Sequence, residues 1–113
     1  MKYALIGCGR IANRHAELLG GNQIKGAELV AVCDIDIIRA KNIGDKYNIP
    51  FFSDMNQMMN SIEVDILVIL TASGQHAKDV IELSKYKKHI IVEKPLALNL
   101  IDASKMIEAC EEN

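Results

Sequence analysis

Small residues near the N-terminus are spaced as in a loop that binds phosphate groups. Residues 7–12 follow an apolar run, open a segment with helical spacing and have the sequence GCGRIA. Gly7 permits a tight turn, Gly9 lets the backbone approach a pyrophosphate, and Ala12 lets the helix pack closely on a sheet. The start of a helix favours an anion, so this motif predicts dinucleotide binding, with a structural turn as the alternative. The residues expected to contact the dinucleotide here are Gly7, Gly9, Arg10, Ile11 and Ala12.

A carboxylate at the end of the second apolar run indicates which dinucleotide would bind. Asp34 follows residues 30–33, and an acid at this position can accept hydrogen bonds from both hydroxyls of the adenosine ribose. The same charge would repel the 2′-phosphate of NADP, and Asp36 adds to that repulsion. We interpret Arg39 as part of a solvated helix face rather than as a phosphate ligand. The sequence therefore favours NAD as the cofactor, with NADP less expected.

A polar loop follows a later apolar run, at the end of the predicted sheet where ligands bind. Residues 71–76 have the sequence TASGQH and enter a helix. We expect Thr71 and Ser73 to contact the cofactor. For His76 two roles stay open: it can face the nicotinamide or its ribose, or it can cap or pack the helix.

A second loop places two opposite charges at the exit of an apolar strand. Residues 93–95 have the sequence EKP and follow the run at residues 89–92. Taken alone, Glu93 and Lys94 are equally consistent with a surface ion pair and with a pair of functional side chains. Their position at the carboxyl end of a predicted strand makes them candidates for the site, because ligands bind at that end.

The elements that position these loops alternate between two periodicities. Short apolar runs predict buried parallel strands. They span residues 3–6, 29–33, 65–70 and 89–92. A fifth, residues 49–52, is expected to be short or at an edge, because Pro50 cannot donate to a ladder.

Segments with helical spacing lie between and after these runs. We expect Asp36 to cap a helix at residues 37–46, Ser53 to cap a short one through Met59, and Asn99 to cap the last. The apolar faces of the other helices are expected to comprise Ile11, Ala12, His15, Leu18 and Leu19 in the first, Ala77, Val80, Ile81 and Ser84 in the fourth, and Ala103, Met106, Ile107 and Cys110 in the last.

Strict alternation of strands and helices predicts one α/β domain over residues 1–113. Right-handed crossovers give a doubly wound parallel sheet, a Rossmann fold, with helices on both faces. A six-stranded sheet of this kind would need one more strand after Asn113. We therefore expect the chain to be truncated, with an open edge at the strand of residues 89–92 and no substrate domain.

Composition excludes several classes of partner. The net charge of −2 has no basic stripe, so we expect no nucleic acid. No apolar run is longer than that at residues 66–70, which is far too short for a membrane span. The three cysteines are scattered without metal-ligand spacing, which predicts buried reduced thiols and no metal site. The apolar stretch at the N-terminus is too short for a signal peptide and runs into the glycine motif, which predicts a cytoplasmic protein.

Three segments resemble the Gfo/Idh/MocA oxidoreductases, and the resemblance covers the whole chain. They are residues 7–15, residues 71–76 and residues 88–95, whose EKP signature is the most specific. Two departures are Ala72, where the family usually has proline, and Lys87, where it commonly has glycine. The first would loosen the loop under the nicotinamide, and neither removes a group that does chemistry.

The resemblance implies an activity and the residues that perform it. Lys94 would be the catalytic lysine, Glu93 would place it, and both would lie at the cofactor. The substrate would be a secondary alcohol of a sugar, cyclitol or nucleotide-sugar, and residues 93–98 are most similar to members that oxidise a nucleotide-linked uronic sugar. The family completes its site with a second α/β domain that usually forms the oligomer interface. We therefore expect a homo-oligomeric full-length enzyme, and a fragment 1–113 that binds cofactor without turnover.

A binding module without catalysis is the alternative function. The glycine loop and Asp34 serve binding only, so they are equally compatible with a non-catalytic NAD(H) sensor. Lys94 separates the two hypotheses, because a module that only binds has no need of a lysine beside the nicotinamide.

Overall fold

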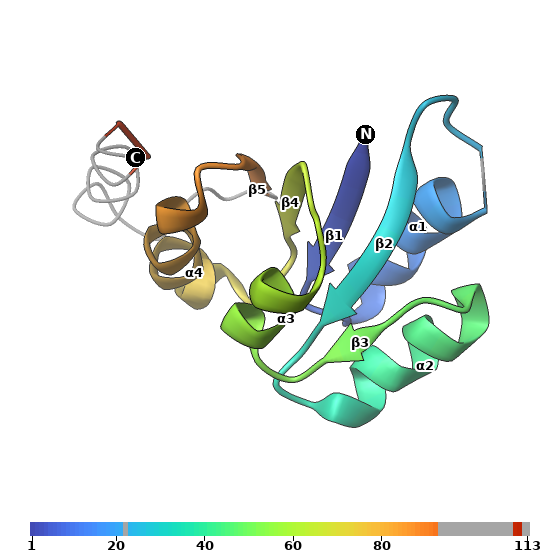
Figure 1. Ribbon diagram of the computed structural model, residues 1–113. Coiled ribbons are helices and arrows are strands. Elements are labelled where there is room, and N and C mark those ends of the chain that lie inside the picture. Colours follow the sequence, from blue (N-terminus) through green and yellow to red (C-terminus); the bar gives the residue numbers. More distant parts are fainter. Residues whose placement is uncertain (22, 93–109, 112–113) are drawn as a thin grey trace.

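Five parallel strands form the single sheet of the described part of the chain (Figure 1). The computed structural model describes residues 1–21, 23–92 and 110–111. The strand order is β3-β2-β1-β4-β5, so the direction of winding reverses between β1 and β4. The strands are β1 (Lys2–Ile6), β2 (Glu28–Cys33), β3 (Phe51–Phe52), β4 (Ile66–Ile69) and β5 (His89–Val92). The carboxyl ends of β1 and β4 therefore meet at a switch point, where such sheets bind ligands.

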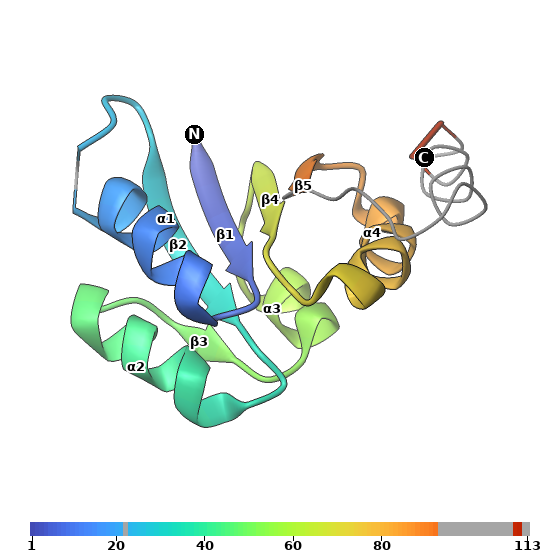
Figure 2. The ribbon, with the colours of Figure 1, turned by 180° about the vertical axis from the view of Figure 1, so that it is seen from behind.

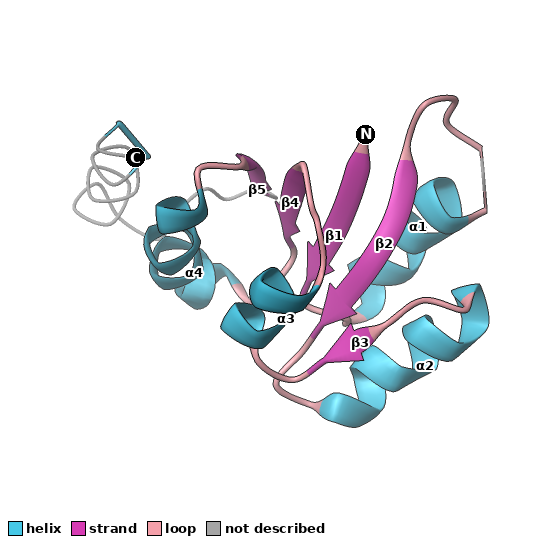
Figure 3. Cartoon of the chain, in the orientation of Figure 1, coloured by secondary structure: helices cyan, strands magenta, loops and turns pink. Residues whose placement is uncertain are grey.

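Helices cover both faces of this sheet, which confirms the predicted doubly wound architecture (Figures 1 and 2). On one face lie α1 (Arg10–Gly20) and α2 (Ile37–Tyr47). On the other lie α3 (Met55–Ser61) and α4 (His76–Leu83). Two short 3₁₀ turns flank α4, at Ser73–Gln75 and Ser84–Tyr86. Figure 3 shows the strict alternation of strand and helix along the chain.

Two apolar clusters, one on each face of the sheet, form the core. Successive residues of β1 belong to opposite clusters: Leu5 packs under α1 and α2, whereas Ala4 and Ile6 pack under α3 and α4. Side chains alternate across a strand, so a sheet covered on both faces needs an apolar residue at every position. This requirement explains why the strands appear in the sequence as continuous apolar runs.

Strand bounds differ slightly from the expectation. The fifth run forms only Phe51–Phe52, at the edge of the sheet beside β2. The carbonyl of Pro50 accepts a hydrogen bond from the Val32 amide, 3.2 Å away, but the proline has no amide to return one. β4 is also shorter than expected, at Ile66–Ile69. At the other edge β5 pairs with β4.

Side-chain caps begin two of the helices. Asp36 caps α2 as predicted, with its Oδ1 accepting from the Ile38 amide at 3.1 Å. The prediction of Ser53 as the cap of α3 was wrong, because Asp54 takes that position. Its Oδ1 accepts from two first-turn amides, at 2.8 and 3.2 Å. A carboxylate satisfies both amides at once and also complements the helix dipole.

The buried face of α1 is rotated from the predicted one. Ala12, Ala16 and Leu19 are buried, whereas Ile11 is 50% exposed and His15 is half-buried. Spacings of three and four residues link the buried positions, so they share one helical face. Ile11 lies about 100° away from Ala12 on the helix, and the sheet does not cover it.

The buried face of α4 carries polar residues that apolar periodicity did not predict. His76, Asp79, Val80 and Leu83 are buried, whereas Ile81 is 39% exposed. Asp79 takes the inward position because a hydroxyl of the preceding loop bonds to it, as described below.

Two expectations concern the end of the chain. The helix capped by Asn99 lies outside the described residues, apart from Cys110 and Glu111, which are helical. The prediction that Cys110 is buried was wrong, because its side chain is exposed, whereas Cys8 and Cys33 are buried. No helix among the described residues is long and apolar enough to cross a membrane.

Candidate functional site

A cavity of about 680 Å³ opens at the carboxyl ends of the strands. It lies at the switch point, with walls from the glycine loop, the end of β2, the start of α3 and the loop between β4 and α4. Its lining residues are Ile6, Gly7, Gly9, Cys33, Asp34, Ile35, Asp36, Arg39, Ser53, Asp54, Met55, Asn56, Leu70, Thr71, Ala72, Gln75, Asp79 and Glu82. This volume and this mixture of apolar and charged side chains suit a cofactor-sized ligand.

Gly7 stands where the ends of three strands meet. Its φ is +101°, and a Cβ added there would lie 2.8 Å from both the Leu70 carbonyl carbon and the Thr71 amide nitrogen. Its own amide donates to the Cys33 carbonyl at 2.7 Å. The turn therefore joins β1, β2 and β4 at the cavity wall, and a side chain fits neither its backbone conformation nor its space.

Gly9 has a different environment, although it belongs to the same loop. A Cβ added to Gly9 would meet no atom within 4 Å, and its φ of −79° is an ordinary one. Gly9 is the N-cap of α1, and it has no side chain with which to bond the first-turn amides. The loop therefore presents a bare helix start beside an open volume, which is the arrangement that binds phosphate groups.

The other three residues expected in this loop do not line the cavity. Ala12 is fully buried and packs in the cluster under α1 and α2. Arg10 and Ile11 are exposed. Any contact of these two residues with a dinucleotide stays a prediction.

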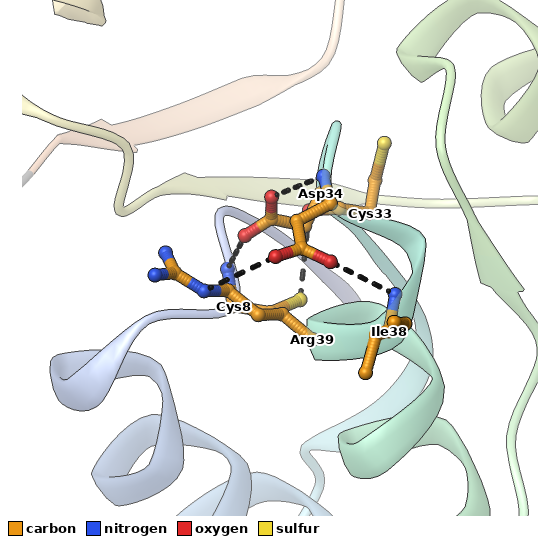
Figure 4. A network of polar contacts seen from close by, with 6 residues as sticks. Cys8, Cys33, Asp34, Ile38 and Arg39 are labelled. Atoms are coloured by element: carbon orange, nitrogen blue, oxygen red, sulfur yellow. Dashed lines mark hydrogen bonds and ion pairs between the residues drawn. The ribbon is translucent and has the colours of Figure 1, made fainter.

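Asp34 joins the glycine loop to the start of α2 (Figure 4). Its Oδ2 accepts from the Cys8 amide at 2.8 Å, and its Oδ1 accepts from the Asp36 amide at 2.8 Å. A carboxylate has about four acceptor positions, so each oxygen keeps capacity for a further donor such as a ribose hydroxyl. These two hydrogen bonds from backbone amides hold the carboxylate at the cavity edge before any ligand arrives.

Two buried thiols, those of Cys8 and Cys33, lie near this carboxylate on opposite faces of the sheet. Burial, reinforced by the charge of Asp34, raises the pKa of Cys8 to about 12 and the pKa of Cys33 to about 12. Cys8 therefore keeps its proton, and its Sγ donates to the Cys33 carbonyl at 3.5 Å (Figure 4). Reactivity requires a thiolate, so these cysteines act as packing residues.

Arg39 lines the cavity and pairs with Asp36. The Arg39 Nε lies 3.6 Å from the Asp36 carboxylate, and both side chains are largely solvated. An exposed pair of this kind contributes little to stability. The predicted solvated helix face thus also forms part of the cavity rim, where the Asp36 carboxylate pairs with the Arg39 guanidinium.

Two polar contacts hold the loop after β4. The Thr71 hydroxyl donates to Asp79 Oδ2 at 2.6 Å, and His76 Nε2 lies 2.8 Å from the Thr71 carbonyl oxygen. A carbonyl only accepts, so His76 Nε2 carries the proton in this contact. His76 is 2% exposed and is not among the lining residues, so here it occupies a packing position. Ser73 begins the 3₁₀ turn of the same loop.

Asp79 was missed by sequence reasoning. It is 6% exposed, lines the cavity, and has a pKa raised above 3.8 because burial penalises its charge. The Thr71 hydrogen bond and the charges of His76 and Lys78 oppose this effect, and the charge of Glu82 adds to it. The sequence signal was its spacing of three residues from His76, which places both on one helical face.

This raised pKa predicts how stability depends on pH. The folded protein holds the Asp79 proton more tightly than the unfolded chain does. Its contribution to the free energy of unfolding is therefore full below pH 3.8 and is lost as pH rises through the folded-state pKa. We expect urea unfolding to show Asp79→Asn gaining stability relative to wild type as pH rises above 3.8 through the folded-state pKa of Asp79.

The exposed Asp45 on α2 provides the control for that experiment. Asp45→Asn removes the same charge from the surface, so it corrects for net charge alone. A difference between wild type and Asp79→Asn that stays constant with pH, or that reverses in sign, would contradict the raised pKa.

The structure thus brings together four of the predicted site residues. Gly7, Gly9, Asp34 and Thr71 all line the same cavity. Glu93 and Lys94 lie outside the described residues, so their placement stays a prediction. Among the described residues, no group of three or more His, Cys, Asp or Glu side chains could hold a metal ion.

Comparison with known proteins places the chain among oxidoreductases. A family model described as an oxidoreductase family with an NAD-binding Rossmann fold matches residues 1–113. Inositol 2-dehydrogenase of Salmonella typhimurium is 33% identical over 115 residues, which cover 100% of this chain and 34% of that protein. The chain therefore spans about a third of the length of the relatives that it matches.

Two solved structures share the fold and were determined with ligands. The WlbA dehydrogenase of Bordetella pertussis, in complex with NADH and UDP-GlcNAcA, is 31% identical with a TM-score of 0.91. The alignment covers 99% of this chain and 34% of that one. Myo-inositol dehydrogenase of Lactobacillus casei, in complex with NAD(H) and myo-inositol, is 27% identical with a TM-score of 0.90 and covers 100% and 34%.

Proposed function

The chain belongs to the Gfo/Idh/MocA family of oxidoreductases, and from that premise we propose that it is the NAD-binding domain of a dehydrogenase. The observation that carries this proposal is the position of the Asp34 carboxylate. Two backbone amides hold it at the rim of the cavity, next to a glycine loop that opens a helix. A family relationship alone would be equally compatible with a domain that has lost its cofactor.

Each part of this cavity suits one part of NAD. The open space at Gly9 and the bare start of α1 would accept the pyrophosphate, because the helix dipole favours its charge. The acceptor capacity left on Asp34 would bind the hydroxyls of the adenosine ribose. The carboxylates of Asp34 and Asp36 would repel the 2′-phosphate of NADP more than Arg39 attracts it.

The reaction is proposed from the family motif at residues 93–95. Bound NAD supplies the acceptor for the hydride that leaves a secondary alcohol carbon. Lys94 would take the hydroxyl proton as that hydride departs, and Glu93 would orient the lysine. General base assistance of this kind contributes about 10²–10⁴-fold to a rate.

The substrate class and the assembly belong to the longer protein. Relatives with bound inositol and bound UDP-GlcNAcA support a sugar, a cyclitol or a nucleotide-sugar as substrate. We propose that a second α/β domain supplies the substrate contacts and the interface of a homo-oligomer, so residues 1–113 alone would bind cofactor without turnover. The buried unpaired thiols of Cys8 and Cys33 support a reducing cytoplasmic location.

A non-catalytic NAD(H) sensor is the second candidate function. The observation that favours it is that every described residue proposed at the cavity serves binding, whereas Glu93 and Lys94 fall outside the described residues. Turnover by the longer protein separates the two functions, as argued in the Discussion.

Calorimetric titration of the chain with NAD⁺ and with NADP⁺ tests cofactor binding. We expect NAD⁺ to bind at least about tenfold more tightly, because an unpaired like charge at the ribose costs more than 1.4 kcal/mol. Asp34→Asn should weaken NAD⁺ binding and reduce the preference for NAD⁺ over NADP⁺, since an amide lacks the charge and one acceptor oxygen. Glu63→Gln, which removes a solvated carboxylate outside the cavity lining, is the matched control. Tighter binding of NADP⁺, or binding of neither nucleotide, would overturn the proposal.

A further inference from the structure

The first turn of α4 fixes Thr71 through both its backbone and its side chain. His76 Nε2 lies 2.8 Å from the Thr71 carbonyl oxygen, and the Thr71 hydroxyl donates to Asp79 Oδ2 at 2.6 Å. His76 and Asp79 are spaced three residues apart, so they lie on the same buried face of the helix. Thr71 and Asp79 both line the cavity, which makes this contact part of its wall.

The direction of the hydroxyl bond determines what Thr71 can offer a ligand. A hydroxyl has one proton and two lone pairs. The proton is committed to Asp79 in a bond with the short length of a charge-assisted pair, so the lone pairs of Oγ1 are what remains. A hydroxyl that donates to a carboxylate also becomes a better acceptor, because hydrogen bonds in a chain polarise one another.

We propose that Asp79 is a positioning residue that makes Thr71 a hydrogen-bond acceptor for the cofactor. The partner is a donor group of the dinucleotide, a ribose hydroxyl or an amide N–H, and not one of its phosphate oxygens. This inference rests on the proposed function, since it assigns a role at the NAD cavity. It adds a residue that neither the glycine motif nor the acid after β2 includes.

The burial of Asp79 supports a role beyond stability. Its ionised form is penalised by the apolar surroundings, and the charge of Glu82 on the same helix adds to the penalty. His76 and Lys78, also on α4, partly offset it, and Thr71 from the facing loop donates the hydrogen bond. An asparagine would fill the same space without this cost, so a purely structural role does not explain the acid.

Calorimetric titration with NAD⁺ on the 113-residue chain tests the inference through four variants. Thr71→Val keeps the shape and removes the acceptor, so binding should weaken about five- to tenfold, as for one lost hydrogen bond. Thr71→Ser restores the hydroxyl and should bind within about twofold of wild type. Asp79→Asn leaves a weaker neutral bond and should weaken binding about threefold. The double variant Thr71→Val/Asp79→Asn should bind no more weakly than Thr71→Val alone, because both changes act on one interaction.

Urea unfolding of the same variants separates positioning from a structural role. Asp79→Asn is expected to be at least as stable as wild type at neutral pH while binding NAD⁺ more weakly. Ser61→Ala is the matched control, because it removes a hydroxyl hydrogen bond of 2.8 Å from an exposed residue at the end of α3, outside the cavity lining. It should leave the NAD⁺ affinity unchanged.

Two results would overturn the inference while leaving the proposed function intact. One is wild-type NAD⁺ affinity in Thr71→Val. The other is tighter binding by Asp79→Asn, which would mean that a freed Thr71 proton is donated to the ligand. Failure of wild type itself to bind NAD⁺ is a different outcome, which removes the proposed function and this inference together.

Discussion

The free energy of unfolding of Gly7→Ala is expected to be about 3 kcal/mol lower than that of wild type. An alanine at a φ of +101° is strained, and its Cβ would lie 2.8 Å from backbone atoms of Leu70 and Thr71. Neither backbone segment can yield cheaply, because Leu70 follows the buried strand β4 and its amide donates to the Ile6 carbonyl at 2.7 Å. Urea unfolding, followed by circular dichroism, measures the loss.

Gly9→Ala is the matched control from the same loop. Its φ of −79° suits alanine, and the added Cβ would meet nothing within 4 Å, so stability should change by less than about 0.5 kcal/mol. The new methyl group would occupy space where the pyrophosphate is proposed to approach, so NAD⁺ affinity should fall by about tenfold or more. Equal losses of stability in the two variants would contradict the structural role of Gly7 and the binding role of Gly9.

Lys94→Ala in the longer protein is expected to lower kcat by about 10²–10⁴-fold. The change removes the group proposed to accept the hydroxyl proton, whereas the glycine loop and Asp34 remain. NAD⁺ affinity should therefore stay within about threefold of wild type. That change is smaller than the tenfold change in affinity that 1.4 kcal/mol of binding free energy produces. Steady-state kinetics with inositol and with a nucleotide-linked uronic sugar, together with calorimetry, give both quantities.

A solvated lysine provides the control for that experiment. Lys41 lies on the exposed surface of α2, so Lys41→Ala changes the net charge equally and should leave kcat unchanged. Unchanged turnover in Lys94→Ala would refute the catalytic assignment. A wild-type longer protein that binds NAD⁺ but turns over neither substrate would favour the sensor function.

The local features of this fold were predictable from the sequence because they depend on neighbours along the chain. Continuous apolar runs predicted the parallel strands, since a strand covered on both faces needs apolar residues at every position. Asp36 was predicted as a cap from its place before a helix. The loop at residues 7–12 was predicted to bind phosphate groups from the spacing of its small residues. Strict alternation of strands and helices predicted the doubly wound parallel sheet, because right-handed crossovers leave few topologies for such a chain.

Tertiary structure alone decided which polar residues are buried at the cavity. The apolar residues of α4 predicted that Ile81 faces inward, yet Asp79 and His76 take those positions. The burial cost of Asp79 is partly offset by a hydroxyl eight residues earlier, on a loop whose path depends on where β4 ends.

Tertiary structure also decided which residues from distant parts of the chain line the cavity. Asp54 and Glu82 reach one volume because α3 and α4 share a face of the sheet. Periodicity records which residues along one helix lie on the same side. It carries no information on the phase of that helix against its neighbours, which is determined by packing among residues far apart in the sequence.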